Sequence, residues 1–436
     1  MKIAGKIEYS LDEWAPSFKY RYYPIHGLKV IRKDRQFHSL NDKKINLKKY
    51  YMKNIQVLKP KFRVDECLSE IKECLDLGWT GMGYKTIEFE DHWKAYTDLN
   101  HAHFLNSASS GLHLAVKILK DKYNWQNDNE IITTPFTFIS TNHSIAYENL
   151  KPCFADIDDS LNLNPQSVRD KINNKTKAII FVGMGGNTKN LIEIINVARE
   201  NNLIIILDAA HMSGSYIDDR HVGFDVDVSI FSFQAVKNLP TADSGMICFN
   251  NEDDDKKARE LSWLGINKDT FARSKDNSYK WDYNVNEVGY KYHGNSIMAA
   301  LGIVGLRYLD EDNQYRRDLA DRYIKNLSGK VDYIKHDSDQ TSRHIFQVVV
   351  ESREKLINYL SANKIFPGVH YRQNTDYEVF YTKSKLPKSE YFSKHILSLP
   401  LHLGLSFEDI DKVSKTLLKG VELQWTKQGW VNYEAY

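Results

Sequence analysis

The chain has 436 residues, of which 42% are hydrophobic and 12% aromatic, so it exceeds the size at which a single core usually stops growing. Its 59 basic and 57 acidic residues leave a net charge of +2, so no overall field favours nucleic acid or an anionic membrane. Four scattered cysteines without a CxxC pair argue against a disulfide framework or a zinc site. With no apolar signal core and no apolar run of about twenty residues, we expect a cytoplasmic protein.

The N-terminal part, residues 1–55, is polar, aromatic and irregular, and we expect an added module or an arm there. Its stretch 19–61 is rich in Lys, Arg and Tyr. A solvated basic face explains this composition, and a polyanion site is the alternative.

Apolar residues at helical spacing predict a helix over 63–77 that ends at Gly78. Short apolar runs then alternate with helical patterns. We expect strands at 102–105, 130–133, 177–182, 203–207, 226–233 and 245–249, and helices at 111–119, 140–147 and 191–200. This alternation indicates βαβ units and a mostly parallel sheet with helices on both faces.

The pattern changes after a long apolar helix that begins at Ile297. A charged helix at 315–327 precedes a mixed region with a strand at 344–350 and helices at 353–363 and 407–417. We therefore predict a large domain over 56–315 and a smaller α+β domain over 316–436.

Polar segments follow several of the predicted strands, at the edge where open α/β sheets bind ligands. In Asn106-Ser-Ala-Ser-Ser-Gly, backbone N–H groups and the hydroxyls of Ser109 and Ser110 could hold a phosphate at a helix N-terminus, or form an ordinary N-cap. Thr133-Thr-Pro-Phe-Thr-Phe supplies an aromatic ring that either stacks on a planar ligand or packs in the core.

Two further segments carry charge. Asp208 directly follows a buried strand, and a protonated pyridine nitrogen would be a suitable partner for its carboxylate. His211 could bond a phenolate oxygen, and Ser232 offers a hydroxyl to a phosphate. Desolvation lowers the pKa of a lysine such as Lys237, whose neutral amine can form a Schiff base. Each residue has an ordinary structural explanation, but together they match the needs of pyridoxal 5′-phosphate (PLP).

These segments resemble the DegT/DnrJ/EryC1/StrS family of sugar aminotransferases, which are fold type I PLP enzymes, over about residues 59–418. The matching motifs are Ile132-Thr-Thr-Pro-Phe-Thr-Phe, Leu207-Asp-Ala-Ala-His, Phe231-Ser-Phe-Gln-Ala-Val-Lys-Asn-Leu and Leu397-Ser-Leu-Pro-Leu-His. Glu287-Val-Gly-Tyr-Lys-Tyr-His-Gly-Asn matches less closely. The resemblance implies a mostly parallel seven-stranded sheet between helices, with a smaller α+β C-terminal domain.

The resemblance also implies roles for individual residues. Lys237 would bind the cofactor covalently and move the proton, with Asp208 at the pyridine nitrogen and His211 at the ring hydroxyl. The other cofactor contacts would come from Phe138 on the ring and from Ala108, Ser109 and Ser232 on the phosphate. Lys291 would reach the phosphate of the partner subunit in a homodimer, and the substrate would meet His370, Tyr371 and His293. No metal is expected.

The implied reaction transfers an amino group from L-glutamate to a keto sugar, in most of the family a nucleotide-linked 3- or 4-keto-6-deoxy sugar for cell-surface polysaccharides such as the lipopolysaccharide O-antigen. Three segments depart from the family pattern: Ala108-Ser109, Lys291–His293, and Val182-Gly-Met-Gly-Gly-Asn, where a histidine is usual. The first is minor, because backbone donors survive it. The other two, with the basic Tyr-rich N-terminal extension, leave open a free keto-sugar acid such as an oxidised octulosonate. A pyridoxamine-dependent dehydratase and a non-catalytic regulatory protein are weaker alternatives, because the chain keeps Lys237.

Overall fold

The computed structural model describes residues 8–10, 19–21, 54–267 and 283–425. The chain divides into two units, Met1–Lys53 and Asn54–Tyr436. In the first unit, β1 (Glu8–Ser10) and β2 (Lys19–Arg21) pair in antiparallel fashion. The rest of the predicted basic stretch before residue 54 lies outside the described residues.

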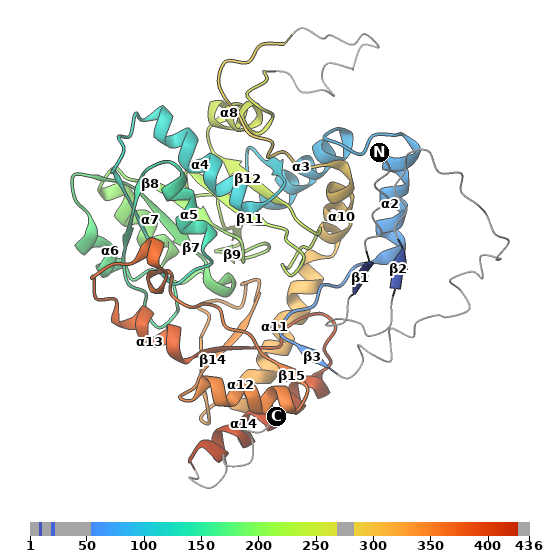
Figure 1. Ribbon diagram of the computed structural model, residues 1–436, viewed down its shortest axis with the longest axis vertical. Helices are drawn as coiled ribbons and strands as arrows, with labels where there is room; N and C mark the ends of the chain where they lie inside the picture. The colour runs from blue at the N-terminus through green and yellow to red at the C-terminus, as the bar shows by residue number, and fades with distance from the viewer. Residues whose placement is uncertain (1–7, 11–18, 22–53, 268–282, 426–436) are drawn as a thin grey trace, which may run out of the picture. The chain divides into compact units, whose positions relative to one another are not determined.

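A seven-stranded sheet forms the centre of the second unit (Figure 1). Its order is β4-β12-β11-β8-β7-β5-β6, and β12 alone runs antiparallel to its neighbours in this sheet. The strands are β4 (His103–Leu105), β5 (Glu130–Thr133), β6 (Lys151–Phe154), β7 (Thr176–Val182), β8 (Ile204–Asp208), β11 (Val228–Ser232) and β12 (Gly245–Phe249). The prediction of a mostly parallel sheet is confirmed.

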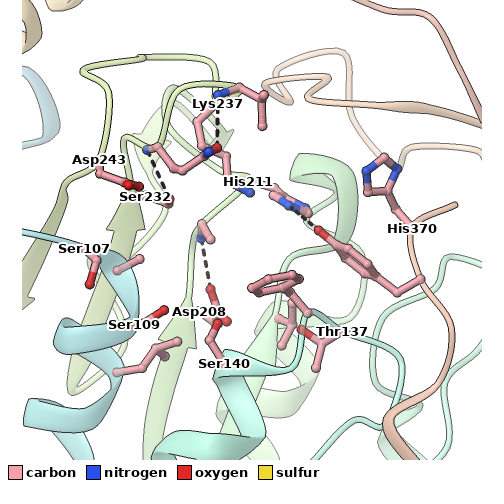
Figure 2. A pocket seen from close by; sticks show the side chains of 18 of the residues that line it. Ser107, Ser109, Thr137, Ser140, Asp208, His211, Ser232, Lys237, Asp243 and His370 are labelled. Carbon is pink, nitrogen blue, oxygen red and sulfur yellow. Dashed lines mark hydrogen bonds between the residues drawn. The ribbon is translucent and has the colours of Figure 1, made fainter. Parts of the chain in front are cut away.

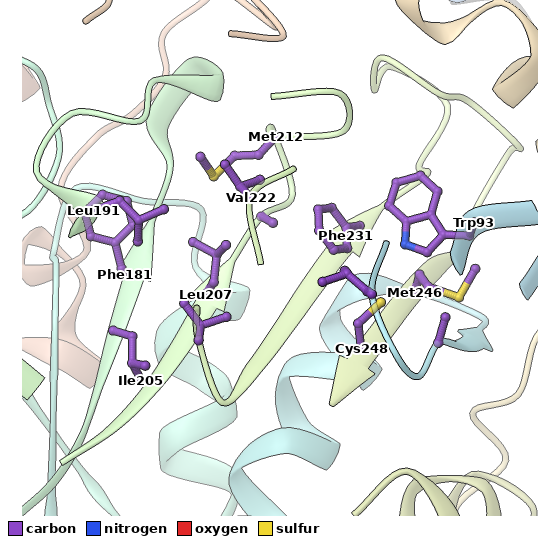
Figure 3. Close-up of a cluster of buried hydrophobic side chains, with 14 of the residues drawn as sticks. Trp93, Phe181, Leu191, Ile205, Leu207, Met212, Val222, Phe231, Met246 and Cys248 are labelled. Atoms are coloured by element: carbon purple, nitrogen blue, oxygen red, sulfur yellow. The ribbon is translucent and has the colours of Figure 1, made fainter. Parts of the chain in front are cut away.

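Successive residues of these strands enter two different cores, one on each face of the sheet. Ile205 and Leu207 of β8 belong to one cluster, and Ile206 between them belongs to the other. The first cluster, shown in Figure 3, is completed by α3 (Tyr84–Thr97), α7 (Leu191–Glu200) and α10 (Ser296–Arg307). The second is completed by α4 (Ala108–Lys122), α5 (Ser140–Tyr147) and α8 (Glu252–Ser262). Burial on both faces explains the continuous apolar strands.

The C-terminal part has its own sheet and core. Strands β13 (Asp332–Tyr333), β14 (Phe346–Val349) and β16 (Ile396–Leu399) form an antiparallel sheet. The helices around it are α11 (Leu309–Leu327), α12 (Arg353–Ala362), α13 (Pro387–His395) and α14 (Phe407–Trp425). β3 (Ile55–Gln56) pairs with β15 (Ile365–Phe366), so the start of this unit lies against its C-terminal part.

The helix predicted over 63–77 is α2 (Val64–Asp76), and Gly78 beyond it adopts a φ of +67°, which glycine tolerates best. The sequence pattern did not indicate α3, because polar residues occupy part of its buried face: Lys85, Thr86, Glu90 and Thr97. It also did not indicate α6 (Pro165–Lys171) or α8. Across residues 54–267 and 283–425, none of the helices combines the length and the apolar character needed to cross a bilayer.

Candidate active site

A cavity of about 460 Å³ opens at the carboxyl ends of β8 and β11, beside the first turn of α4 (Figure 2). Segments far apart in sequence meet there, as the fold rule for open α/β sheets predicts. Its polar and aromatic lining residues include Ser107, Ser109, Phe138, Asp208, His211, Ser232, Gln234, Lys237, Asp243, His370 and Tyr371. The backbone of Ala108 also belongs to this wall.

Lys237 lies in the turn that follows β11, where its backbone N–H donates to the Gln234 carbonyl at 2.8 Å. Its side chain lines the cavity and is only partly exposed. Burial lowers the pKa of Lys237 to about 8, although the negative charge of Asp208 opposes this change. A fully solvated strand-end lysine, the ordinary explanation of its sequence position, is therefore excluded, and the ammonium loses its proton far more readily than that of an ordinary lysine.

Asp208 ends β8 as a buried carboxylate. Its Oδ2 accepts a hydrogen bond from Thr141 Oγ1 at 2.7 Å, and its Oδ1 accepts one from the Ala210 N–H at 3.2 Å. Burial raises the pKa of Asp208, and these two hydrogen bonds oppose the rise. Within the described part of the chain no cationic side chain forms an ion pair with it, so the site offers a buried carboxylate suited to a cationic ring nitrogen.

The first turn of α4 provides an anion site. Ser107 is the N-cap, and its side chain accepts from the Ser110 N–H. The next N–H groups, of Ala108 and Ser109, have no acceptor within the helix and lie at the cavity wall. Gly245 permits this arrangement, because a Cβ there would lie 2.6 Å from the Ala108 nitrogen. Ser232, on the neighbouring strand, adds a hydroxyl to the same wall.

The tautomer of His211 follows from its hydrogen bonds. Its Nδ1 accepts from the Gly185 N–H at 3.2 Å, so a neutral ring carries its proton on Nε2, which lies 3.3 Å from the Tyr371 hydroxyl. Burial holds the pKa of His211 well below its usual value, with smaller contributions from Lys237 and His370. His211 is therefore a neutral N–H donor at the cavity.

A second histidine, His344, packs against the ring of His211. The two ring centroids are 4.4 Å apart. The Nδ1 of His344 lies 2.8 Å from Asn238 Oδ1, while the Asn238 amide nitrogen donates to Asn313 and to the Ser342 carbonyl. This buried network joins the residue after Lys237 to the C-terminal part of the chain. The sequence motifs did not indicate His344 or Thr141, because both lie in predicted elements but outside the motifs that marked the site.

The aromatic and substrate-side residues lie at the opposite wall. The ring of Phe138 is 58% exposed and 6.0 Å from that of Tyr371, so it is open to a planar ligand instead of being packed in the core. His370 Nδ1 lies 2.8 Å from Ser398 Oγ, and burial lowers the pKa of His370 to about 4. The structure therefore brings Phe138, His370 and Tyr371 together with Lys237.

Lys291 and His293 lie outside the cavity in this chain. The Lys291 Nζ is 3.3 Å from the centre of the Trp263 ring, and the His293 ring is 4.5 Å from that ring. Neither side chain lines the cavity. Their segment nevertheless borders the site, because the Asn106 N–H donates to the Tyr292 carbonyl at 2.7 Å.

Comparison with known proteins identifies the family. The model of the DegT/DnrJ/EryC1/StrS aminotransferase family matches residues 61–418. The chain belongs to this family. It is 31% identical to the spore coat polysaccharide biosynthesis protein SpsC of Bacillus subtilis over 376 residues, which are 82% of this chain and 95% of SpsC. It is also 31% identical to the uncharacterised protein MJ1066 of Methanocaldococcus jannaschii, over 81% of this chain and 95% of that protein.

Solved structures agree with this assignment. The aminotransferase TlmJ of Streptoalloteichus hindustanus superposes with a TM-score of 0.79 at 25% identity, over 85% of this chain and all of TlmJ. Spr1654 of Streptococcus pneumoniae, a proposed sugar aminotransferase solved in PLP and PMP forms, has a TM-score of 0.78 in its PMP form at 27% identity, over 85% and 99% of the two chains. The protein is a sugar aminotransferase with the fold type I architecture, and its cofactor is PLP.

The cavity of this family member fits that cofactor. The buried Asp208 carboxylate suits the pyridine nitrogen, and the open helix end at Ala108 and Ser109 suits the phosphate. Among the described residues, no group of His, Cys, Asp and Glu side chains is arranged to hold a metal ion.

Proposed function

We propose that the protein transfers the amino group of L-glutamate to a nucleotide-linked keto sugar, giving an amino sugar for a cell-surface polysaccharide. The observation that carries this proposal is the position of Lys237, whose pKa is lowered to about 8 in the same cavity as Asp208 and the first turn of α4. The likeness to SpsC, a spore coat polysaccharide biosynthesis protein, supports the polysaccharide context. A cytoplasmic location is part of the proposal.

We assign the proton chemistry to Lys237. When PLP is bound, its ring supplies an electron sink that stabilises negative charge at the reacting carbon. Lys237 would hold the cofactor through Nζ, and when free its neutral Nζ would accept and return the proton. The Asp208 carboxylate would keep a proton on the ring nitrogen, and His211 would donate from Nε2 to the ring oxygen.

The remaining contacts complete the proposed site. The N–H groups of Ala108 and Ser109, with the Ser232 hydroxyl, would bind the phosphate, and Phe138 would cover the ring face. His370 and Tyr371 would orient the sugar. Lys291 and His293, which lie outside their own cavity, would act on the partner's site in a homodimer. The domain boundaries at about residues 55 and 315 also remain predictions.

One observation favours a second acceptor class. The segment Val182–Asn187, where the family usually places a histidine, contributes only Val182, the last residue of β7, to the cavity. Met184 of this segment is 1% exposed and packs with Phe136 and Ile345 in a separate core cluster. The acceptor sugar would therefore not contact a histidine from this segment, unlike in most of the family. A free keto-sugar acid such as an 8-keto octulosonate is the second candidate.

A panel of keto sugars tests both candidates. The purified enzyme is supplied with L-glutamate and each sugar, nucleotide-linked or free, and release of 2-oxoglutarate is measured. We expect turnover with one class, and no turnover after Lys237→Ala. Failure with every sugar, together with no change in cofactor absorbance on addition of glutamate, would overturn the proposal.

A further inference from the structure

A second, much smaller cavity lies behind Lys237. Its volume is about 10 Å³, and it shares Lys237 and Val236 with the main cavity. The rest of its wall consists of residues 58–61, Pro240, Arg316, His344 and residues 401–403. The wall includes Leu401 and His402, the last two residues of the Leu397–His402 motif, which do not line the main cavity. The lining contains basic side chains and no carboxylate.

Arg316, on α11, is one of the basic residues that line this cavity. The residue is 6% exposed. Within the described residues its hydrogen bonding is confined to Nη1, which donates to the Asp312 carbonyl at 3.3 Å. The Asp312 carboxylate is already engaged by Arg63, with contacts of 2.5 and 2.7 Å. A guanidinium has five N–H donors, so most of those of Arg316 are unused.

His402 adds a second unused donor. The residue is 5% exposed, and its Nδ1 accepts from the Gly404 N–H at 3.1 Å, so the neutral ring carries its proton on Nε2. By strict geometry that buried nitrogen has no hydrogen-bond partner among the described residues, although the backbone of Gln56 is close enough to raise the pKa of His402. Burying such a donor without an acceptor costs free energy, which a bound anion would recover.

We propose that Arg316 and His402 bind a carboxylate of the amino donor. The inference rests on the proposed function, in which that donor is L-glutamate. The cavity has room for about one water-sized group, which fits one carboxylate oxygen and excludes a phosphate. Lys237 is the wall between the two cavities, so displacement of its side chain by the donor amine joins them. Arg316 is thus a specificity-determining residue for the donor.

The donor half-reaction tests this assignment without any sugar. Glutamate is added to the PLP enzyme, and conversion of the cofactor is followed by absorbance. Arg316→Met removes the positive charge. Arg316→Lys keeps the charge but removes the planar set of guanidinium N–H donors. We expect the glutamate concentration for half-maximal rate to rise about ten- to a hundredfold in Arg316→Met, the usual range for one lost charge-assisted hydrogen-bond partner. The rate of cofactor conversion at saturating glutamate should change much less in this variant.

Arg317→Met is the matched control. Arg317 is the next residue of α11, and its guanidinium bonds Gln314 and the Thr341 carbonyl outside this cavity. This variant should keep the wild-type response to glutamate. Glutarate, which has the carboxylates but no amine, should inhibit the wild type and the control but lose affinity for both Arg316 variants and for His402→Phe.

The outcomes separate the explanations. Unchanged glutamate dependence and unchanged glutarate inhibition in Arg316→Met would overturn the inference, as would an equal loss in the donor and acceptor half-reactions, which indicates a structural role. If the Arg316 variants lose inhibition by chloride but keep inhibition by glutarate, the cavity is a halide site and the donor assignment is wrong. A wild type that shows no donor half-reaction would contradict the proposed function itself.

Discussion

Replacing Lys237 by methionine should stabilise the cofactor-free protein. The ordinary lysine pKa of 10.5 falls to about 8 in the folded chain, because burial disfavours the ammonium form more than Asp208 favours it. At about 1.4 kcal/mol per pH unit, this difference means that burying the ammonium lowers the free energy of unfolding by roughly 3 kcal/mol. Because the side chain keeps some solvent contact, part of this cost is screened, and we expect a gain of about 1 to 3 kcal/mol for Lys237→Met at pH 7.

The sign of the pH dependence follows from the same difference. The folded pKa of Lys237 lies below its unfolded value, so the unfolded chain binds more protons between about pH 8 and 10.5. The destabilising cost is fully present below pH 8 and disappears as the pH rises through this window. The advantage of Lys237→Met over the wild type should therefore be constant below pH 8 and shrink towards pH 10.5.

Urea unfolding of the cofactor-free proteins measures this effect at several pH values, followed by tryptophan fluorescence. Lys335→Met, at an exposed lysine, serves as the control and should change stability by less than about 0.5 kcal/mol. A Lys237→Met protein that is no more stable than the wild type at pH 7, or whose advantage grows above pH 8, would refute the assignment of Lys237 as a desolvated amine.

Three further predictions concern groups around the site and the sheet. Thr141→Val removes the hydrogen bond to Asp208 Oδ2, so the Asp208 pKa rises further and an absorbance titration at pH 7 should show about tenfold weaker PLP binding; unchanged affinity would contradict this. Gly245→Ala places a Cβ 2.6 Å from the Ala108 nitrogen and should destabilise the fold by about 1 to 3 kcal/mol and weaken PLP binding, and a neutral result in both assays would argue against the phosphate cradle. Burial opposes ionisation of Glu90, but Arg259 and His103 outweigh it and lower its pKa to about 2. Arg259→Met should therefore cost about 3 to 5 kcal/mol in urea unfolding at pH 7, with a penalty that shrinks as the pH falls from 4.5 towards 2; a penalty independent of pH would refute this reasoning.

The strand ends were the predictable part of the site. Asp208, Ser232 and the first turn of α4 each follow or adjoin a strand of the parallel sheet, and such ends necessarily meet at one edge. Local patterns therefore indicated both the residues and their common location. Phe138 and His370 were placed by family resemblance, and the structure brings their side chains to the same cavity.

Helix α3 shows where pattern reasoning failed. Its buried face includes Lys85 and Glu90, whose charges are compensated by residues from other elements. Lys85 meets Glu70 of α2, and Glu90 meets Arg259 of α8. An apolar period cannot reveal a helix whose burial depends on ion pairs that form only in the folded state.

The sequence by itself determined the fold class, most strands of the central sheet, the family and the cofactor, because apolar periodicity and short motifs are local properties of the chain. Only the tertiary structure decided which groups tune that site. Thr141 reaches Asp208 across 67 positions, and Asn238 reaches His344 across 106. The unused donors of Arg316 and His402 likewise come together only when α11 and the C-terminal segment fold against Lys237. Desolvation and hydrogen-bond satisfaction depend on everything that surrounds a group, so such partners become visible only in the folded chain.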